Sequence, residues 1–498
     1  GRMLTPGFVD AHVHPVWGGL DLMRCNLAED VTSEAYLERI GEYALANPDA
    51  EWILGGGWAM AAFPGGTPTA AALDGVVSDR PAFLANRDGH GAWVNSAALR
   101  LAGIGRGTPD PPDGRIERDG GGEPTGTLHE GAMILVNRLI PQTSEAEMSE
   151  ALLLGQGYLH SLGVTGWQDA IVGAYGDAGD PAQAYLTAAQ DGSLTGRVVG
   201  ALWWDRGAGL EQLDALHERR ERFSHGRFQA SAVKIMQDGV AENFTAAMLE
   251  PYCDGHGQWT DNSGISFVEP RLLRSAVTAL DEAGFQVHFH AIGDRAVREC
   301  LDAVESARAA NGTNDLRHHI AHLQVVHPDD IARFRRLRVA ANLQMLWATL
   351  EPQMVELTLP FLGEPRSAWQ YPFGDLLRSG AVLVAGSDWS VSTPNPWAAM
   401  HVAVNRSTPP GEVEPGAPAE PYEAFLPEQA IDLGTALTAY TAGSAWVNHL
   451  DDCGRIQQDA LADLVVLDRD PFDAPADEVG LTRVDQTYVG GRLVFERS

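Results

Sequence analysis

One lysine stands apart in this sequence, because it offers chemistry that the arginines cannot. Lysine and arginine total 35; Lys234 is the only lysine, and the other 35 − 1 = 34 are arginine. It lies in the apolar run 231–239, SAVKIMQDG, which is typical of a buried strand. A buried lysine can lose its proton, whereas arginine keeps its charge. A neutral amine reacts with carbon dioxide to give a carbamate, an anionic ligand that bridges two metal ions; the alternative is that arginine bias left one lysine by chance.

Other residues of metal-ligand type recur along the chain. His12 and His14 are two apart on a predicted strand, so both side chains leave the same face. By itself this pair is more typical of hydrogen-bonded polar residues than of a metal site. Further ligand types end later predicted strands, and the complete set is His12, His14, Lys234, His290, His322 and Asp388. Nitrogen and oxygen donors of this kind favour one or two zinc ions, although iron, manganese and nickel accept them too.

This set of ligands predicts hydrolysis by activated water. Two divalent metal ions lower the pKa of a water molecule and polarise a carbonyl group. We expect Asp388 to hold a metal ion and also to act catalytically, taking the proton of the water and passing it to the leaving nitrogen. Nearby polar residues are interpreted as structural: His288 pointing away from His290, His318 and His319 at the surface or supporting the ligands, and Asp294 as a helix cap.

Eight short β-rich runs alternate with helical patterns, which is the rhythm of parallel βα units. The eight runs are residues 4–14, 163–169, 196–204, 228–237, 285–290, 317–326, 339–346 and 381–388. This count predicts an α/β fold, a (β/α)₈ TIM-like barrel, whose active site would lie where the strands end.

Two further parts are expected beside the barrel. Residues 1–47 hold the first strand and the segment after it, 48–145 form an inserted cap subdomain rich in glycine and proline, and 146–453 complete the barrel. Residues 454–498 alternate in short strands and are expected to be part of a small accessory β-sandwich. Because the chain starts almost at once with a buried strand, we expect residues before Gly1 to supply the other half.

Composition excludes several classes of partner. The formal net charge of −32 disfavours binding to nucleic acid and to anionic membranes, and no apolar stretch approaches 18 residues. The four cysteines form no Cys-x-x-Cys pair and are expected to be free thiols in a reducing, cytoplasmic compartment. We expect a small-molecule substrate, and the sequence leaves open whether the chain forms a homo-oligomer.

Four motifs resemble the amidohydrolase superfamily, in the branch often called amidohydrolase family 3, which includes N-substituted formamide deformylases. They are PGFVDAHVH at 6–14, VHFHAIGDR at 287–295, RHHIAH at 317–322 and GSD at 386–388. The resemblance extends over nearly the whole chain and implies a metal-dependent barrel hydrolase acting on carbon–nitrogen bonds, with the six residues above at its ligand positions. The branch holds one or two metal ions. Ala321 departs from it, since glutamate is frequent there, so one contact near the ligands is expected to differ.

The substrate is expected to be a small non-peptide amide, with an N-substituted formamide as the specific prediction. His90 is expected either to hydrogen-bond the substrate carbonyl or, equally, to hold the cap together. Trp58 and Trp347 are expected to form an apolar wall of the substrate pocket. Two alternatives stay open: hydrolysis of a cyclic amide or a carbamate by the same metal site, and a binding or regulatory protein without catalysis.

Overall fold

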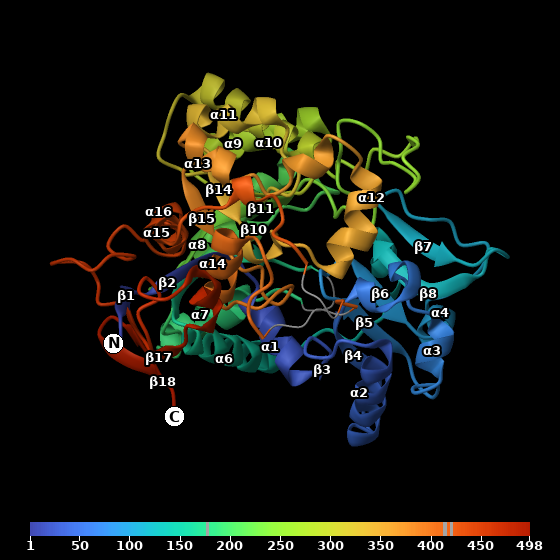
Figure 1. Cartoon of the computed structure of the whole chain (residues 1–498). Helices are drawn as coiled ribbons and strands as arrows, with labels where there is room; N and C mark the ends of the chain where they lie inside the picture. The colour runs from blue at the N-terminus through green and yellow to red at the C-terminus, as the bar shows by residue number, and fades with distance from the viewer. Residues whose placement is uncertain (176–178, 412–415, 419–421) are drawn as a thin grey trace.

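A parallel sheet of eight strands forms the centre of the computed structural model, which describes residues 1–175, 179–411, 416–418 and 422–498 (Figure 1). In spatial order its strands are β15 (Leu383–Ala385), β14 (Ala340–Leu343), β13 (His319–His322), β12 (Gln286–Ala291), β11 (Phe228–Met236), β10 (Arg197–Trp203), β9 (Val164–Val172) and β2 (Phe8–Val13). Each lies within one of the eight predicted runs or extends it by a few residues, so the predicted barrel is confirmed.

Hydrogen bonds beyond the last strand bring the two ends of this sheet together. The Asp388 amide donates to the carbonyl of His12 over 2.8 Å, and the His14 amide donates to the carbonyl of Trp389 over 2.7 Å. Gly386 allows this approach, because a Cβ there would lie 2.6 Å from Cβ of His12. The barrel therefore closes where its candidate ligands meet.

Helices between the strands cover the outside of the barrel. They are α6 (Glu145–Ser161), α7 (Ala182–Asp191), α8 (Leu213–Phe223), α9 (Pro270–Glu282), α10 (Asp294–Asn311), α11 (Pro328–Leu337) and α13 (Phe373–Ser379), with α14 (Pro396–Asn405), α15 (Leu433–Thr438) and α16 (Ser444–Val447) after the last strand. The starts follow local chemistry: Ser144 and Glu147 form a capping box at α6, and Glu269 caps α9, where Pro270 takes the first position.

The inserted subdomain starts earlier than predicted. Its six-stranded sheet has the order β3 (Cys25–Asn26), β4 (Ile53–Trp58), β5 (Ala82–Asn86), β6 (Gly91–Val94), β8 (Pro124–Glu130) and β7 (Gly114–Arg118). Helices α2 (Ser33–Ala46), α3 (Ala70–Asp74), α4 (Ser96–Ala102) and α5 (Ile134–Asn137) accompany it, and the whole lies to the right of the barrel in Figure 1. The boundary at residue 48 therefore cuts through this unit, because β3, from before that boundary, pairs with β4.

The C-terminal strands form a single antiparallel sheet together with the start of the chain. Its order is β1 (Leu4–Pro6), β16 (Leu464–Leu467), β17 (Val484–Val489) and β18 (Arg492–Glu496). The predicted first strand, 4–14, is thus two strands that belong to different sheets. They separate at Gly7, whose amide donates to the carbonyl of Asp463 over 2.8 Å and whose Cβ position would lie 2.3 Å from Thr165 Oγ1.

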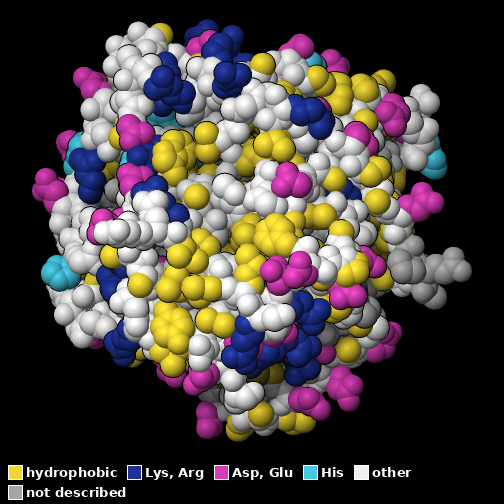
Figure 2. All heavy atoms as spheres, turned by 60° about the vertical axis from the view of Figure 1, so that its left-hand side comes forward, with side chains coloured by type: hydrophobic (Ala, Val, Ile, Leu, Met, Phe, Trp, Pro, Cys, Tyr) yellow, Lys and Arg dark blue, Asp and Glu magenta, His cyan; other side chains and the backbone are white. Residues whose placement is uncertain are grey.

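The outer surface carries both charges among apolar side chains (Figure 2). The basic groups visible there are arginines, because the one lysine is buried. All four cysteines are free and buried. Among the described residues, no helix is both long and apolar enough to cross a membrane.

Candidate active site

One cavity of about 290 Å³ collects all six predicted ligands at the ends of the barrel strands. His12 lies within β2, and His14 follows the last residue of β2 and is the N-cap of α1 (Pro15–Met23). Each side chain is at most 7% exposed: His12, His14, Lys234, His290, His322 and Asp388. The structure therefore brings together every residue that sequence reasoning assigned to a metal site.

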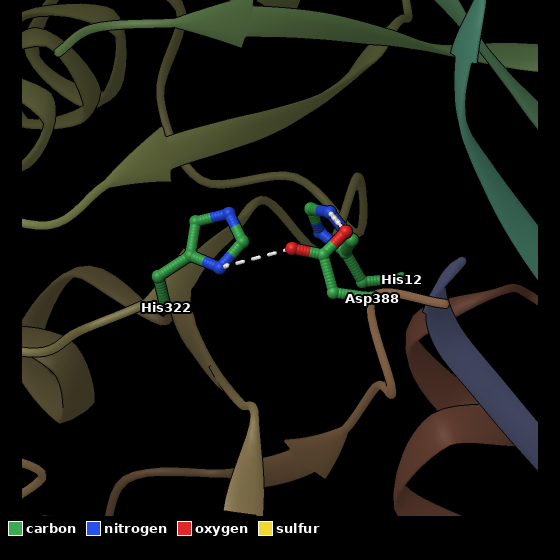
Figure 3. Close-up of side chains that lie close together, drawn as sticks. All are labelled: His12, His322 and Asp388. Atoms are coloured by element: carbon green, nitrogen blue, oxygen red, sulfur yellow. Dashed lines mark ion pairs between the residues drawn. The ribbon is translucent and has the colours of Figure 1, made fainter. Parts of the chain in front are cut away.

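Asp388 is the centre of the group. Its Oδ1 lies 3.0 Å from Nε2 of His14 and 3.2 Å from Nε2 of His12, while its Oδ2 lies 3.8 Å from Nδ1 of His322. Potential ligand atoms of His12, His322 and Asp388 all lie within 4.8 Å of one another. Figure 3 shows the carboxylate of Asp388 between the two imidazoles. Asp388 and His322 both have positive φ, 57° and 80°, a costly backbone for residues other than glycine and one found at functional sites.

Several of these atoms are buried but lack a protein partner, which fits a bound metal ion. Oδ1 of Asp388 receives no hydrogen bond of acceptable geometry despite two nearby imidazoles, and Nδ1 of His14 and of His322 have no hydrogen-bond partner in the described part of the chain. A buried unpaired polar atom costs about 1–3 kcal/mol. Two or more imidazoles with a carboxylate are a donor set that suits divalent ions such as zinc.

The protonation states of these residues also favour metal binding. Burial raises the pKa of Asp388, but the neighbouring histidines outweigh it and hold this pKa well below its usual range. Burial lowers the pKa of His12 to about 3 and also lowers the pKa of His290 and of His322. An ionised carboxylate and neutral imidazoles are the forms that bind metal.

Lys234 is 1% exposed and lies on β11, two residues before the strand ends. Burial lowers its pKa to about 7, so a large fraction of the amine is neutral near neutral pH. No hydrogen bond or ion pair holds this amine within the described ranges. A buried, unpaired, partly neutral amine beside metal ligands meets the requirements for carbamate formation.

A second group of histidines lies below and beside the predicted ligands. The expectation that His288 points away from His290 is wrong: residues two apart on a strand share a face, and His288 Nε2 lies 2.8 Å from Nδ1 of His12. His318 and His319 are fully buried, which excludes a surface position. His318 Nε2 contacts Asp281 at 2.8 Å and His319 Nε2 contacts Gln168 at 2.9 Å. His288 and His319 therefore lie inside the barrel beneath the predicted ligands, whereas His318 points outward and connects its strand to α9.

Asp294 is not a ligand, as expected, but neither is it the cap of α10. It is the first residue of that helix after Gly293, and its Oδ1 accepts a hydrogen bond from the amide of Leu249 over 2.9 Å.

On the substrate side, the structure places two of three predicted residues at the cavity. Trp347 and His90 line it. The Trp347 ring stacks on His322 at 5.2 Å, and its Nε1 donates to Ser392 over 3.1 Å. Trp58 has to be corrected: it is fully buried in the core of the inserted subdomain, where Nε1 donates to the carbonyl of Leu84. Three glycines before it indicated a loop, but they belong to strand β4.

Trp17 and Tyr175 are among the aromatic residues at the cavity that the sequence did not predict. Trp17 stacks on His14 with ring centroids 4.6 Å apart, and Tyr175 stacks on Trp17 at 5.5 Å. Trp17 follows the His-x-His pair by three residues, and Pro15 at the first position of α1 turns the chain so that this ring covers His14. The sequence feature that could have identified Trp17 is an aromatic residue soon after a strand that carries predicted metal ligands.

His90 reaches the cavity from the inserted subdomain. Its Nδ1 lies 2.9 Å from Oε1 of Glu130, and its ring centroid is 5.5 Å from that of His290. Burial lowers the pKa of His90, but the charge and hydrogen bond of Glu130 outweigh it and raise this pKa to about 9. Glu130 thus favours the protonated form of His90, whereas burial favours the neutral form of the neighbouring His290.

Comparison with known proteins agrees with this geometry. The sequence pattern of the Amidohydrolase family matches residues 1–495. The protein LONG AFTER FAR-RED 3 of Arabidopsis thaliana is 32% identical over 99% of this chain and 82% of its own length. The Exoenzymes regulatory protein AepA of Pectobacterium carotovorum subsp. carotovorum is 30% identical over 77% and 82%. The N-substituted formamide deformylase of Arthrobacter pascens is 28% identical over 100% and 89%.

A solved relative shares the architecture as well. The crystal structure of an uncharacterized metal-dependent hydrolase from Pyrococcus furiosus is 26% identical, with a TM-score of 0.68 over 95% of this chain and 88% of that one. The resemblance inferred from the four motifs is confirmed. The chain belongs to the amidohydrolase family.

Proposed function

We propose that this protein is a zinc-dependent amidohydrolase that cleaves the carbon–nitrogen bond of a small non-peptide amide. The observation that carries the proposal is the buried carboxylate of Asp388, which lies within 3.2 Å of two imidazole nitrogens with Oδ1 left unpaired at the bottom of a cavity. A bound divalent metal ion supplies an activated water molecule and polarises the carbonyl group.

The protein's own groups have separate tasks around that reaction. His12, His14, His290 and His322, with Asp388 and carboxylated Lys234, would hold one or two metal ions. Asp388 accepts a proton through one carboxylate oxygen and returns it to the leaving nitrogen, because its ionised form is favoured in this site. Trp17 and Trp347 cover two of the ligand histidines and keep the surroundings apolar.

An N-substituted formamide is the substrate class we favour. The formyl group is small enough to lie beside the ligands, while the N-substituent would contact the aromatic side chains of the cavity. The relative from Arthrobacter pascens, which is named for this activity, supports the class at 28% identity.

Elemental analysis tests the metal centre first. The protein is purified without chelator in bicarbonate buffer, beside Lys234→Ala. We expect close to two zinc ions per chain in the wild type and fewer in the variant. One metal ion in both would indicate a mononuclear site in which Lys234 has no part, and no metal in either would contradict the proposal.

Product analysis tests the reaction. Formate and a free amine are expected from a formamide panel. A ring-opened acid, or carbon dioxide with an alcohol, would instead indicate the cyclic amide or carbamate alternative. The relative named as a regulatory protein favours a second candidate, a binding function without catalysis. That candidate requires a metal-loaded protein that hydrolyses none of these compounds. The four free, buried cysteines support a reducing, cytoplasmic location.

A further inference from the structure

Behind the cavity histidine of the inserted subdomain lies a carboxylate that does not itself line the cavity. Nδ1 of His90 lies 2.9 Å from Oε1 of Glu130, and Glu130 is 4% exposed. His90 comes just before β6, and Glu130 ends β8, its antiparallel neighbour. The pair therefore comes from two adjacent strands, 40 residues apart in the chain.

Both residues are fixed by the barrel as well as by each other. The Thr245 hydroxyl donates to Oε1 of Glu130 over 2.8 Å. The carbonyl of His90 accepts the amide of Glu130 over 3.0 Å and the side-chain amide of Asn243 over 2.9 Å. Thr245 and Asn243 follow β11, the strand that carries Lys234, so the pair is attached to the metal-ligand side of the barrel.

Gly239 makes room for this arrangement. A Cβ there would lie 2.4 Å from Oε1 of Glu130 and 2.1 Å from Oγ1 of Thr245, closer than real contacts allow. The carbonyl of the same glycine lies 3.3 Å from Nε2 of His290. One backbone segment thus contacts both the carboxylate behind His90 and a predicted metal ligand.

Glu130 adopts an unfavourable backbone conformation to reach this place. Its φ is 51° and its ψ is −127°, outside the regions that residues with a side chain prefer. Such conformations cost about 1–3 kcal/mol and concentrate at functional sites.

We propose that Glu130 is a positioning residue that holds His90 so that Nε2 of His90 donates a hydrogen bond to the carbonyl oxygen of the substrate. This inference rests on the proposed amidohydrolase function. Nδ1 is engaged by Glu130, and Nε2 has no partner among the residues that the structure describes. An ionised carboxylate beside an imidazole favours its doubly protonated form, in which the free nitrogen is a donor. Negative charge that develops on the carbonyl oxygen would be stabilised from the side opposite the barrel ligands.

The same subdomain contains a matched control. Nε2 of His129 lies 3.0 Å from Oε1 of Glu117, and His129 is 2% exposed. Neither residue of this second pair lines the cavity. Glu117→Gln therefore removes the same type of charge contact from the same sheet without approaching the substrate.

Kinetics of Glu130→Gln and Glu117→Gln, both metal-loaded, test the proposal with N-benzylformamide or whichever amide of the panel the wild type hydrolyses. We expect kcat of Glu130→Gln to fall about 10²-fold with KM changed less than about threefold, as for loss of a donor to a developing oxyanion. Glu117→Gln should stay within about twofold of the wild type. Equal losses in both variants, or a Glu130→Gln variant that keeps a third of kcat, would overturn the proposal.

A double-mutant cycle separates positioning from folding. If Glu130 acts through His90, adding Glu130→Gln to His90→Ala should cost no further activity. Independent, additive losses would contradict the inference. Thermal unfolding and metal content of each variant show whether it folds, and Thr245→Val, which removes one contact to Glu130, replaces any variant that does not.

A substrate-free measurement keeps this inference distinct from the proposed function. The protein is labelled with ¹⁵N in its histidine rings, and the His90 signals are identified by their absence in His90→Ala. We expect protons on both ring nitrogens of His90 at pH 7 in the wild type and loss of this state in Glu130→Ala. Unchanged signals would overturn the role of Glu130. If the wild type hydrolyses no amide, the proposed function fails, and this spectrum alone decides whether Glu130 positions His90.

Discussion

Two layers of buried histidine belong to the same barrel and differ in what surrounds them. The upper layer, at the strand ends, holds His12, His14, His290 and His322. The lower layer holds His288 and His319 inside the barrel and His318 on its outer side, where it contacts Asp281 of α9. In the upper layer, Nδ1 of His14 and of His322 are buried without a partner. In the lower layer, His318 and His319 each use both ring nitrogens: His318 contacts Asp281 and the amide of Val287, and His319 contacts Gln168 and Asn342. His288 is the exception in this layer, because its Nδ1 is also buried without a hydrogen-bond partner.

His14 and His322 therefore differ from His318 and His319 in the satisfaction of the ring, and not in residue type or burial, which is why we interpret the first two as candidate ligands. All four lie on strands of one sheet or directly beside them. Unpaired buried nitrogens lower stability, so a protein keeps them where they serve another purpose. The layers meet at His12, whose Nδ1 contacts His288 while its Nε2 faces Asp388. That contact orients a ligand from below.

The largest expected effect comes from the carboxylate of the upper layer. Asp388→Asn should leave the fold intact and reduce kcat roughly 10³-fold, because the amide cannot accept and return the proton. Asp294→Asn is a matched control, since Asp294 also follows a barrel strand but only accepts the amide of Leu249, which asparagine can still do. Steady-state kinetics of both variants measure the difference in kcat. An Asp388→Asn enzyme with most of its kcat would remove Asp388 from proton transfer.

The two layers should respond in opposite ways to loss of a ring. His319→Ala leaves Gln168 and Asn342 with unpaired atoms and should lower the free energy of unfolding by about 3 kcal/mol, with metal content unchanged. His322→Ala removes a ring nitrogen that has no hydrogen-bond partner among the described residues, so metal content should fall while the metal-free protein loses less stability. Urea unfolding and elemental analysis of both variants test this. Loss of metal in His319→Ala but not in His322→Ala would mean that the lower layer, and not the upper one, binds the metal.

Trp17 and Trp58 differ in a comparable way, because Trp17 lines the cavity and Trp58 lies in the core of the inserted subdomain. Trp17→Leu should raise KM roughly five- to tenfold for formamides with an aromatic N-substituent and less for aliphatic ones, because an aromatic contact is worth about 0.5–1.5 kcal/mol. Trp58→Leu should lower stability and leave both KM values alone, since Trp58 packs against Phe63 and Trp93. Equal KM changes for both substrate types in Trp17→Leu would place this ring in the scaffold.

Sequence reasoning reached the barrel and its ligands because both depend on short-range patterns. Parallel strands end at one face of the barrel, so ligand types at strand ends had to meet. It missed Glu130, whose contact with His90 depends on the pairing of β6 with β8 and on a backbone conformation that no local pattern indicates. It misplaced Trp58 because strand β4 consists largely of glycine, which is typical of loops. The partner of β1 lies more than 450 residues away in the chain, so the division of the first strand at Gly7 had no local sign.

The smallest expected effect concerns pH and the lower layer. Nδ1 of His318 accepts the amide of Val287, so a neutral ring donates from Nε2 to Asp281. Burial lowers the pKa of His318 below its usual 6.5. The unfolded chain therefore binds this proton at a higher pH than the folded one, and the contribution of His318 to stability is present above about pH 6.5 and declines as the pH falls below it. His318→Gln keeps an acceptor and a donor but cannot titrate. Relative to pH 7.5, the wild type should lose about 1 kcal/mol more than this variant at pH 5.5, as measured by urea unfolding. Parallel curves for the two proteins would mean that His318 is protonated alike in both states and that the lower layer is not held in its neutral form.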